Sequence, residues 1–167
     1  WALLTTTAED GAPFTTHLSL LWQEAGGPHG SLIGHVARAN PHGKLFARPA
    51  ESLALFWGPH AYVSPTWYTP GVKVPTWNYV TVHAYGRPQI IEDTKGALDV
   101  LATLAREYEV AGPEGWGLDR LPAALFILAR HLRITRRLGQ HVDAVRAIGV
   151  GERAPARLLA VHAVMQP

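Results

Sequence analysis

The hydrophobic pattern of this 167-residue chain changes its period near residue 92, and this change constrains the fold more than any other feature. Before it, short apolar and β-branched runs are separated by Gly, Pro and Asp turns, which is typical of antiparallel strands. After it, apolar residues such as Leu98, Leu101 and Leu104 recur at the spacing of one helix face. Strands followed by helices predict an α+β fold, with a small antiparallel barrel and peripheral helices in the C-terminal half.

The pattern predicts a single domain, 1–167, in which residues 1–92 are mostly β and residues 93–167 mostly helical. The expected strands are 1–7, 14–22, 31–36, 52–57, 61–64 and 77–91. A Gly58-Pro59 turn is expected between two of them, and Asn40-Pro41 is expected to open a helical turn. The expected helices are 95–110 (capped by Thr94), 121–132, 142–148 and 154–164, with a last strand near 132–138.

The composition excludes several classes of function. There is no cysteine, so disulfides, thiol catalysis and cysteine-based zinc sites are excluded, and a reducing cytoplasm fits this absence. A formal net charge of +2 is too small to indicate nucleic-acid binding by itself. No apolar run approaches the roughly 20 residues of a membrane span, so no membrane partner is expected. The nine histidines form no HxH or HExxH motif, and no metal site is predicted.

Residues 56–87, FWGPHAYVSPTWYTPGVKVPTWNYVTVHAYGR, gather three tryptophans, four tyrosines and two histidines among closely spaced prolines. A hydrophobic core does not need so much indole and imidazole together. Aromatic bodies with polar edges on stiff loops suit a flat heteroaromatic ligand or a subunit contact. The segment therefore predicts one of these two roles.

Residues 35–44, HVARANPHGK, place two cations at the start of the expected helical turn. A helix N-terminus offers free N–H groups, so a phosphate would sit here, with Arg38 or Lys44 neutralising it and Asn40 capping the turn. The alternative is an ordinary capped turn with solvated charges. On the second strand, Thr15, His17 and Ser19 share one face while Thr16 points the other way. That polar face is either the solvent side or the lining of a ligand cleft.

Three motifs, GHVARANP at 34–41, FWGPHAYVSPTWY at 56–68 and VPTWNYVTVHAYGR at 74–87, resemble the PaiB family, described as FMN-binding negative transcriptional regulators. The resemblance is colinear from about Trp1 to Arg87. It implies an FMN-binding split β-barrel, related to flavin reductases and pyridoxamine phosphate oxidases. It also implies a homodimer with FMN at the subunit interface. DNA is a possible partner through the family name alone.

The resemblance implies three groups of cofactor-binding residues. These are Thr16, His17 and Ser19 along the cleft; His35, Arg38, Asn40 and Lys44 at the phosphate end; and Thr76, Trp77 and Asn78 from the aromatic segment. The chain departs from the family pattern at Gly43 and Lys44, where the family has tryptophan and arginine, and at 138–143. Lysine keeps the positive charge but loses the bidentate fork of arginine.

The leading hypothesis is a cytoplasmic, FMN-binding regulator of the PaiB type rather than an enzyme, and no catalytic residue is identified. One alternative is a flavin-dependent oxidoreductase using NAD(P)H, with His60, His83 or Tyr62 in proton transfer. Another is a haem-binding split barrel with a histidine as axial ligand. Residues 142–164 are the candidate for helix-turn-helix DNA binding, although Pro155 would fall inside the recognition helix.

Overall fold

The computed structural model describes residues 1–25, 29–67, 71, 74–110, 112, 115–120 and the backbone of 132–136. Its strands form two four-stranded antiparallel sheets, in the orders β2-β1-β5-β6 and β3-β4-β8-β7. The strands are β1 (Ala2–Thr7), β2 (Pro13–Leu18), β3 (Leu20–Gln23), β4 (Ser31–Ala37), β5 (Ser52–Val63), β6 (Thr76–Gly86), β7 (Gln89–Ile91) and β8 (Leu132–Arg136).

Two bent strands join the sheets into a barrel. β2 continues into β3 across Ser19, and β6 continues into β7 across Arg87 and Pro88. Neighbouring strands therefore return to their start in the order β1, β2/β3, β4, β8, β7/β6, β5 and again β1. The barrel is split where each bent strand leaves one sheet for the other. The predicted α+β class and split β-barrel are confirmed.

Alternate residues of the strands fill the barrel interior, where Leu4 and Leu32 are among the buried side chains. Gly34 lies where β4 passes close to the bend between β2 and β3. A Cβ at Gly34 would lie 2.6 Å from Leu20 Cδ2 and 2.6 Å from the Ser19 carbonyl oxygen. Glycine at this position therefore allows the close approach of β4 to the bend.

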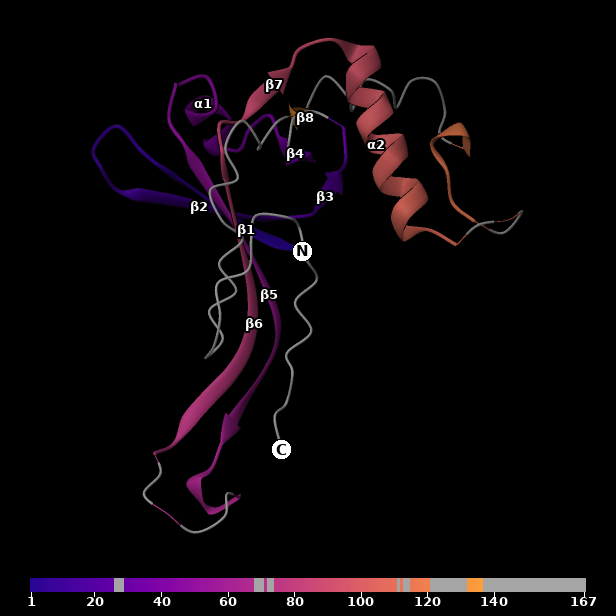
Figure 1. The fold of residues 1–167 in the computed structure, drawn as a ribbon. Coiled ribbons are helices and arrows are strands. Elements are labelled where there is room, and N and C mark those ends of the chain that lie inside the picture. The colour runs from indigo at the N-terminus through magenta and orange to yellow at the C-terminus, as the bar shows by residue number, and fades with distance from the viewer. Residues whose placement is uncertain are drawn as a thin grey trace.

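α2 (Thr94–Tyr108) packs on the outer face of the second sheet, where Ala97, Val100 and Leu104 form a second core with Ile33 of β4 (Figure 1). Its N-cap is Asp93, so the prediction of a Thr94 cap is wrong by one residue. The Asp93 carboxylate accepts a 2.7 Å hydrogen bond from the Gly96 amide and carries the charge that a helix N-terminus favours. No helix among the described residues is long and apolar enough to cross a membrane.

The turn predicted at Gly58-Pro59 is wrong, because β5 is continuous from Ser52 to Val63. Between the pairs Trp57–Thr81 and His60–Tyr79, two residues of β5 oppose one residue of β6, which makes a β-bulge. Proline has no N–H for the strand ladder, and the bulge accommodates it without ending the strand. β8 confirms the strand predicted near 132–138. The helices predicted at 121–132, 142–148 and 154–164 lie outside the described residues, except for Leu132, which begins β8.

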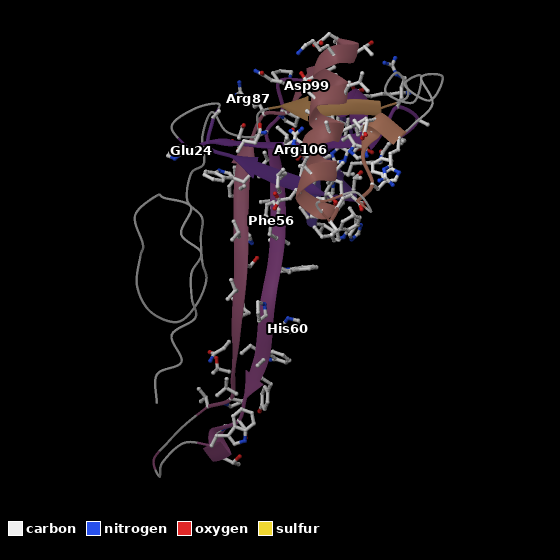
Figure 2. All side chains as sticks on the ribbon, turned by 90° about the vertical axis from the view of Figure 1, so that its right-hand side faces the viewer. Glu24, Phe56, His60, Arg87, Asp99 and Arg106 are labelled. Atoms are coloured by element: carbon white, nitrogen blue, oxygen red, sulfur yellow. The ribbon has the colours of Figure 1, made fainter. Side chains whose placement is uncertain are left out.

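β5 and β6 extend beyond the barrel as a two-stranded ribbon. β5 pairs with β1 only from Ser52 to Leu55, and farther out it pairs with β6 alone. We call residues 57–81 the arm. Figure 1 shows it ending at η1 (Pro65–Trp67), at the opposite end of the molecule from α1 (His42–Leu45), and Figure 2 shows His60 farther out along β5 than Phe56. A two-stranded ribbon is marginally stable in water unless something covers it.

Candidate functional site

Residues 38–44, which lead from the end of β4 into α1 and are called the turn below, present two exposed cations. Arg38 and Lys44 form no ion pair within the described part of the chain. The Asn40 side chain closes the turn, because its Oδ1 accepts a 2.9 Å hydrogen bond from the His42 amide. α1 is only four residues long, so its dipole is small and the two side-chain cations supply the charge that an anion would meet.

His42 is a residue of this turn that sequence reasoning missed. Its side chain is fully buried, with Nδ1 2.8 Å from Thr16 Oγ1 and Nε2 2.8 Å from Thr6 Oγ1. Burial lowers the pKa of His42 to about 4, so the imidazole is neutral at pH 7. One signal could have found it. Thr6 and Thr16 occupy interior positions of their strands, and a buried hydroxyl requires a hydrogen-bond partner.

The predicted alternation on β2 is confirmed. Thr16 faces the interior and contacts His42, whereas Thr15 faces outward and its hydroxyl lies 3.0 Å from that of Thr5. His17 and Ser19 alternate with buried leucines and therefore lie on the outer side as well. Thr16 and His17 thus stand on opposite sides of the barrel wall.

His35 lies on the outer side of β4 and joins the group of His17 and Ser19. Continuing the Leu20–Gly34 pairing by one residue places Ser19 opposite His35. The Nδ1 atom of His35 is buried and has no hydrogen-bond partner among the described residues, and burial lowers the pKa of this histidine. A buried ring nitrogen left unpaired is a position where a ligand could complete the hydrogen bonding.

The arm carries an exposed aromatic face. Strand register pairs Tyr62 with Trp77 and His60 with Tyr79, so these four side chains share one face. The bulge places Trp57 on the same face, although an uninterrupted strand would turn it away from His60. Tyr62 and Trp77 meet edge to face with ring centroids 5.7 Å apart, yet Trp57 is 74% exposed and Trp77 56% exposed. Large aromatic side chains exposed together mark a binding surface.

The turn and the aromatic face are far apart within one chain. Ser52 lies beside the turn, because its hydroxyl is 2.5 Å from Thr6 Oγ1, which in turn contacts His42. Ten residues of strand separate Ser52 from Tyr62, the cross-strand partner of Trp77. Because one of the ten is the extra residue of the bulge, the span at the rise of a β-strand is about 30 Å. The distance exceeds the length of one FMN molecule.

The predicted site residues therefore fall into separate groups. The structure brings Thr16 together with Asn40, through a 3.4 Å contact between Asn40 Nδ2 and Thr16 Oγ1. It brings His17, Ser19 and His35 together on the outer side of the barrel. It places Thr76, Trp77 and Asn78 on the arm, with Thr76 and Asn78 on the face opposite Trp77.

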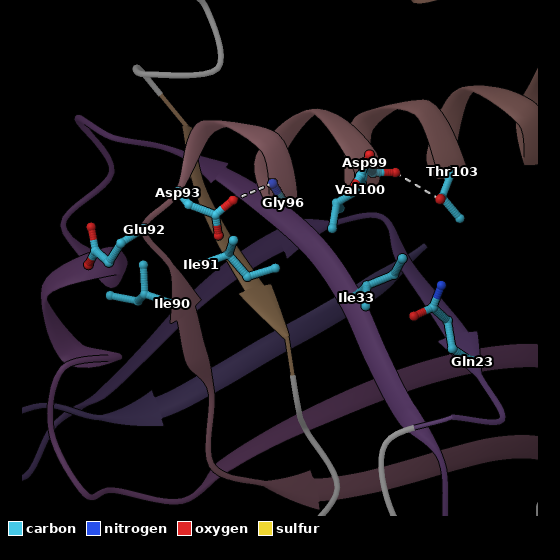
Figure 3. Close-up of a pocket in the computed structure, with 10 residues that line it drawn as sticks. All are labelled: Gln23, Ile33, Ile90, Ile91, Glu92, Asp93, Gly96, Asp99, Val100 and Thr103. Atoms are coloured by element: carbon cyan, nitrogen blue, oxygen red, sulfur yellow. Dashed lines mark hydrogen bonds between the residues drawn. The ribbon is translucent and has the colours of Figure 1, made fainter.

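A shallow pocket of about 520 Å³ lies elsewhere, between α2 and the second sheet (Figure 3). Its floor is Ile33, Ile91 and Val100, which belong to the core under α2. Asp93 in its wall caps the helix, and the backbone carbonyl of Asp99 accepts a hydrogen bond from the Thr103 hydroxyl. No predicted site residue lines it, and we interpret it as a packing groove beside α2. Among the described residues, no three histidine or carboxylate side chains gather as metal ligands would.

The barrel, with a cationic turn at one end and an aromatic arm at the other, defines the class of this protein, a split β-barrel. Residues 1–134 match the sequence family described as "Putative FMN-binding domain", and the chain belongs to that family. It is therefore an FMN-binding split-barrel protein, with FMN as its cofactor.

Two curated relatives are similar to parts of the chain. The Bacillus subtilis protein named "Protease synthase and sporulation protein PAI 2" is 39% identical over 103 residues, 62% of this chain and 48% of that protein. An uncharacterised protein of Saccharomyces cerevisiae is 36% identical over 105 residues, 60% of this chain and 62% of that protein. The chain thus spans about half to three fifths of these relatives. The predicted resemblance to the PaiB family is confirmed.

A solved structure supports the fold. The flavocytochrome Anf3 of Azotobacter vinelandii matches 81% of this chain and 56% of its own, with a TM-score of 0.60 and 16% sequence identity. At this identity the likeness concerns the fold alone.

The residues of the turn fit the charged end of FMN. Arg38 and Lys44 are exposed cations with no counter-ion among the described residues, which suits a phosphate dianion. His35 Nδ1 is a buried polar atom that still lacks a partner. When FMN is bound, its isoalloxazine ring supplies the redox chemistry. Binding of the phosphate at this turn stays a prediction from the sequence.

Proposed function

We propose that the chain acts as a homodimeric, cytoplasmic regulator of the PaiB type, in which each FMN lies between the barrel of one copy and the arm of the other. The proposal depends on the roughly 30 Å of strand between Ser52, which lies beside the turn, and Tyr62, the cross-strand partner of Trp77. Within one chain these two groups are too far apart to hold the same cofactor. A twofold dimer gives each site a turn from one copy and an arm from the other.

The outer face of the first sheet supports a second copy as the partner. Leu3 pairs with Leu55, and Leu53 lies two residues along the same strand face, so an apolar stripe crosses the sheet on its outer side. The aromatic face of the arm continues this stripe, because Leu55 pairs with His83 on the β6 face that also carries Trp77. An apolar and aromatic surface of this kind, on a ribbon that needs covering, is typical of a subunit interface.

The turn favours binding over catalysis. Residues 38–44 include two cations and one amide side chain but no carboxylate, and their one imidazole, that of His42, is fully buried and cannot reach a substrate. The regulatory role is supported by the family resemblance and by similarity to the relative named for protease synthase and sporulation. The cytoplasmic location is supported by the absence of cysteine from the sequence.

The first test compares FMN and riboflavin, which differ in the phosphate, by titration followed with flavin absorbance and fluorescence. We expect Lys44→Ala to weaken FMN by about tenfold and to leave riboflavin nearly unchanged, because a hydrogen bond to a charged group contributes about 1.5 kcal/mol. Lys95→Ala is the matched control, since Lys95 is an exposed lysine of α2 paired with Asp99. Equal losses for both flavins would remove Lys44 from the phosphate site.

The second test measures the oligomeric state by size-exclusion chromatography with light scattering. We expect Trp77→Ala to weaken the dimer and FMN binding together. Trp116→Ala, which removes an indole of similar exposure outside the arm, should weaken neither. A Trp77→Ala protein that stays dimeric with normal FMN affinity would refute the shared site. Steady NADH or NADPH oxidation by the FMN-loaded dimer, with no DNA binding, would replace the regulator with an oxidoreductase.

A further inference from the structure

A buried chain of hydrogen bonds joins the barrel to the turn. It runs from Ser52 on β5 to Thr6 on β1 at 2.5 Å, from Thr6 to His42 Nε2 at 2.8 Å, and from His42 Nδ1 to Thr16 on β2 at 2.8 Å. It ends at Asn40, whose Nδ2 lies 3.4 Å from Thr16 Oγ1. Thr6 of β1 and Thr16 of β2 therefore meet at one imidazole, and Ser52 of β5 is joined to it through Thr6.

The donors and acceptors of this chain favour one direction. Asn40 Nδ2 can only donate, so Thr16 Oγ1 accepts from it and can donate its own hydrogen to His42 Nδ1. The remaining ring hydrogen is then on Nε2 and is donated to Thr6, whose hydroxyl can donate to Ser52. With this assignment Thr16 and Thr6 each both accept and donate, and both ring nitrogens of His42 are satisfied.

The packing holds the imidazole rigidly. Phe14 lies edge to face against the His42 ring with centroids 5.0 Å apart. The Phe46 ring lies with its centroid 4.8 Å from that of His42, and the two ring planes are tilted by 37°. The side chain has no exposed surface. A group enclosed in this way cannot reach a ligand directly, so its influence on the site acts through the residues that it holds.

We propose that His42 is a positioning residue, which holds the 38–44 turn in the conformation that presents Arg38 and Lys44 to the cofactor phosphate. This inference rests on the proposed placement of the FMN phosphate at the turn. His42 acts on the turn in two ways. Its own amide is bonded to Asn40 Oδ1, and its ring holds Thr16, which contacts Asn40 Nδ2. Through these contacts it determines the preference for the phosphorylated flavin.

Three substitutions of His42 separate the two ends of the hydrogen-bond chain. His42→Phe keeps an aromatic ring between Phe14 and Phe46 but removes both hydrogen bonds. His42→Asn keeps a polar atom near the position of Nδ1, facing Thr16, and His42→Gln keeps one near Nε2, facing Thr6. If the link through Thr16 positions the turn, Asn should preserve its geometry better than Gln.

The first readout is the ratio of riboflavin Kd to FMN Kd, measured on the full chain. We expect His42→Phe to lower this ratio by about tenfold or more, His42→Gln to lower it nearly as much, and His42→Asn to restore most of it. Leu104→Ala is the control, because it weakens the core under α2, on the outer face of the second sheet. It should leave the ratio unchanged. An unchanged ratio in folded His42→Phe would overturn the proposal.

The second readout needs no cofactor. The amides of Gly43 and Lys44 donate to Asn40 O and Pro41 O, so amide hydrogen exchange reports whether the turn is closed. We expect exchange at these amides to be at least tenfold faster in His42→Phe than in the wild-type chain, and unchanged exchange would overturn the positioning role.

A wild-type chain that takes up no FMN would refute the proposed function, while this exchange measurement would still decide the role of His42. If His42→Phe does not fold, Thr16→Val removes one hydroxyl at nearly constant volume and should show the same two losses. Normal selectivity and normal exchange in that variant would overturn the proposal.

Discussion

Lowering the pH from 7 to 5 should destabilise the folded protein by about 2 kcal/mol, because His42 is buried as a neutral imidazole. Its pKa is 6.5 in the absence of burial and about 4 in the folded protein. Between these two values the unfolded chain binds a proton that the folded chain does not. The stability that is present above pH 6.5 is therefore lost as the pH falls toward 4.

The magnitude follows from the distance of pH 5 below the unfolded pKa. At pH 5 the unfolded imidazole is almost fully protonated and the folded one almost fully neutral. This pH lies about 1.5 units below the unfolded pKa, and each unit lowers the free energy of unfolding by about 1.36 kcal/mol. A loss of about 2 kcal/mol is a large share of a typical stability of about 5–15 kcal/mol. It should lower the urea midpoint by about 1 M for an ordinary denaturant slope.

The assay is urea unfolding followed by tryptophan fluorescence at pH 7 and pH 5, at one protein concentration. His42→Gln, which cannot titrate, should lose about 2 kcal/mol less than the wild type over this interval. His35→Gln is a second comparison, because burial also lowers the pKa of His35 and contributes in the same direction. Equal losses in the wild type and in His42→Gln would show that the reasoning about His42 is wrong.

Three further predictions concern stability and are tested by the same urea midpoints at pH 7. Asp93→Ala should destabilise the protein by about 1 kcal/mol, because the 2.7 Å cap to the Gly96 amide is lost, and Asp93→Asn should recover most of it. Lys95→Ala should leave the midpoint unchanged, since both side chains of its ion pair with Asp99 are exposed, and a clear shift would contradict this. Gly34→Ala should destabilise by about 2 kcal/mol or more, because its Cβ would lie 2.6 Å from a backbone oxygen, and a stable variant would mean that β4 can move away from the bend.

The hydrophobic period was enough to predict most strands and the face that each residue occupies. Thr16 and His17 show this clearly, because their opposite orientations follow from a period of two and the structure has them so. The helix at 94–108 was equally readable, since its apolar stripe covers the outer face of the second sheet. These features depend on residues that are close together along the chain, so a single sequence is enough to predict them.

The misreadings have a different cause, which is pairing between distant segments. Gly58-Pro59 is a turn signal locally, but β6 pairs on both sides of it and keeps the strand continuous. His42 was missed because its partners Thr6 and Thr16 belong to strands far from it in sequence; their interior positions show that each hydroxyl needs a partner, but not which residue supplies it. The distance between the turn and Trp77 likewise depends on how far β5 continues beyond the barrel.

The bulge at Gly58 and Pro59 also affects how readily the chain aggregates through pairing of its strand edges. Beyond the barrel, β5 and β6 pair only with each other, so the arm has two free strand edges, and such edges recruit other strands into aggregates. Pro59 has no amide donor to offer, and the extra residue of the bulge breaks the regular repeat that a foreign strand would need to match. A single chain thus carries an interrupted edge in its most aromatic segment, which limits fibre-like stacking while leaving the aromatic side-chain face exposed.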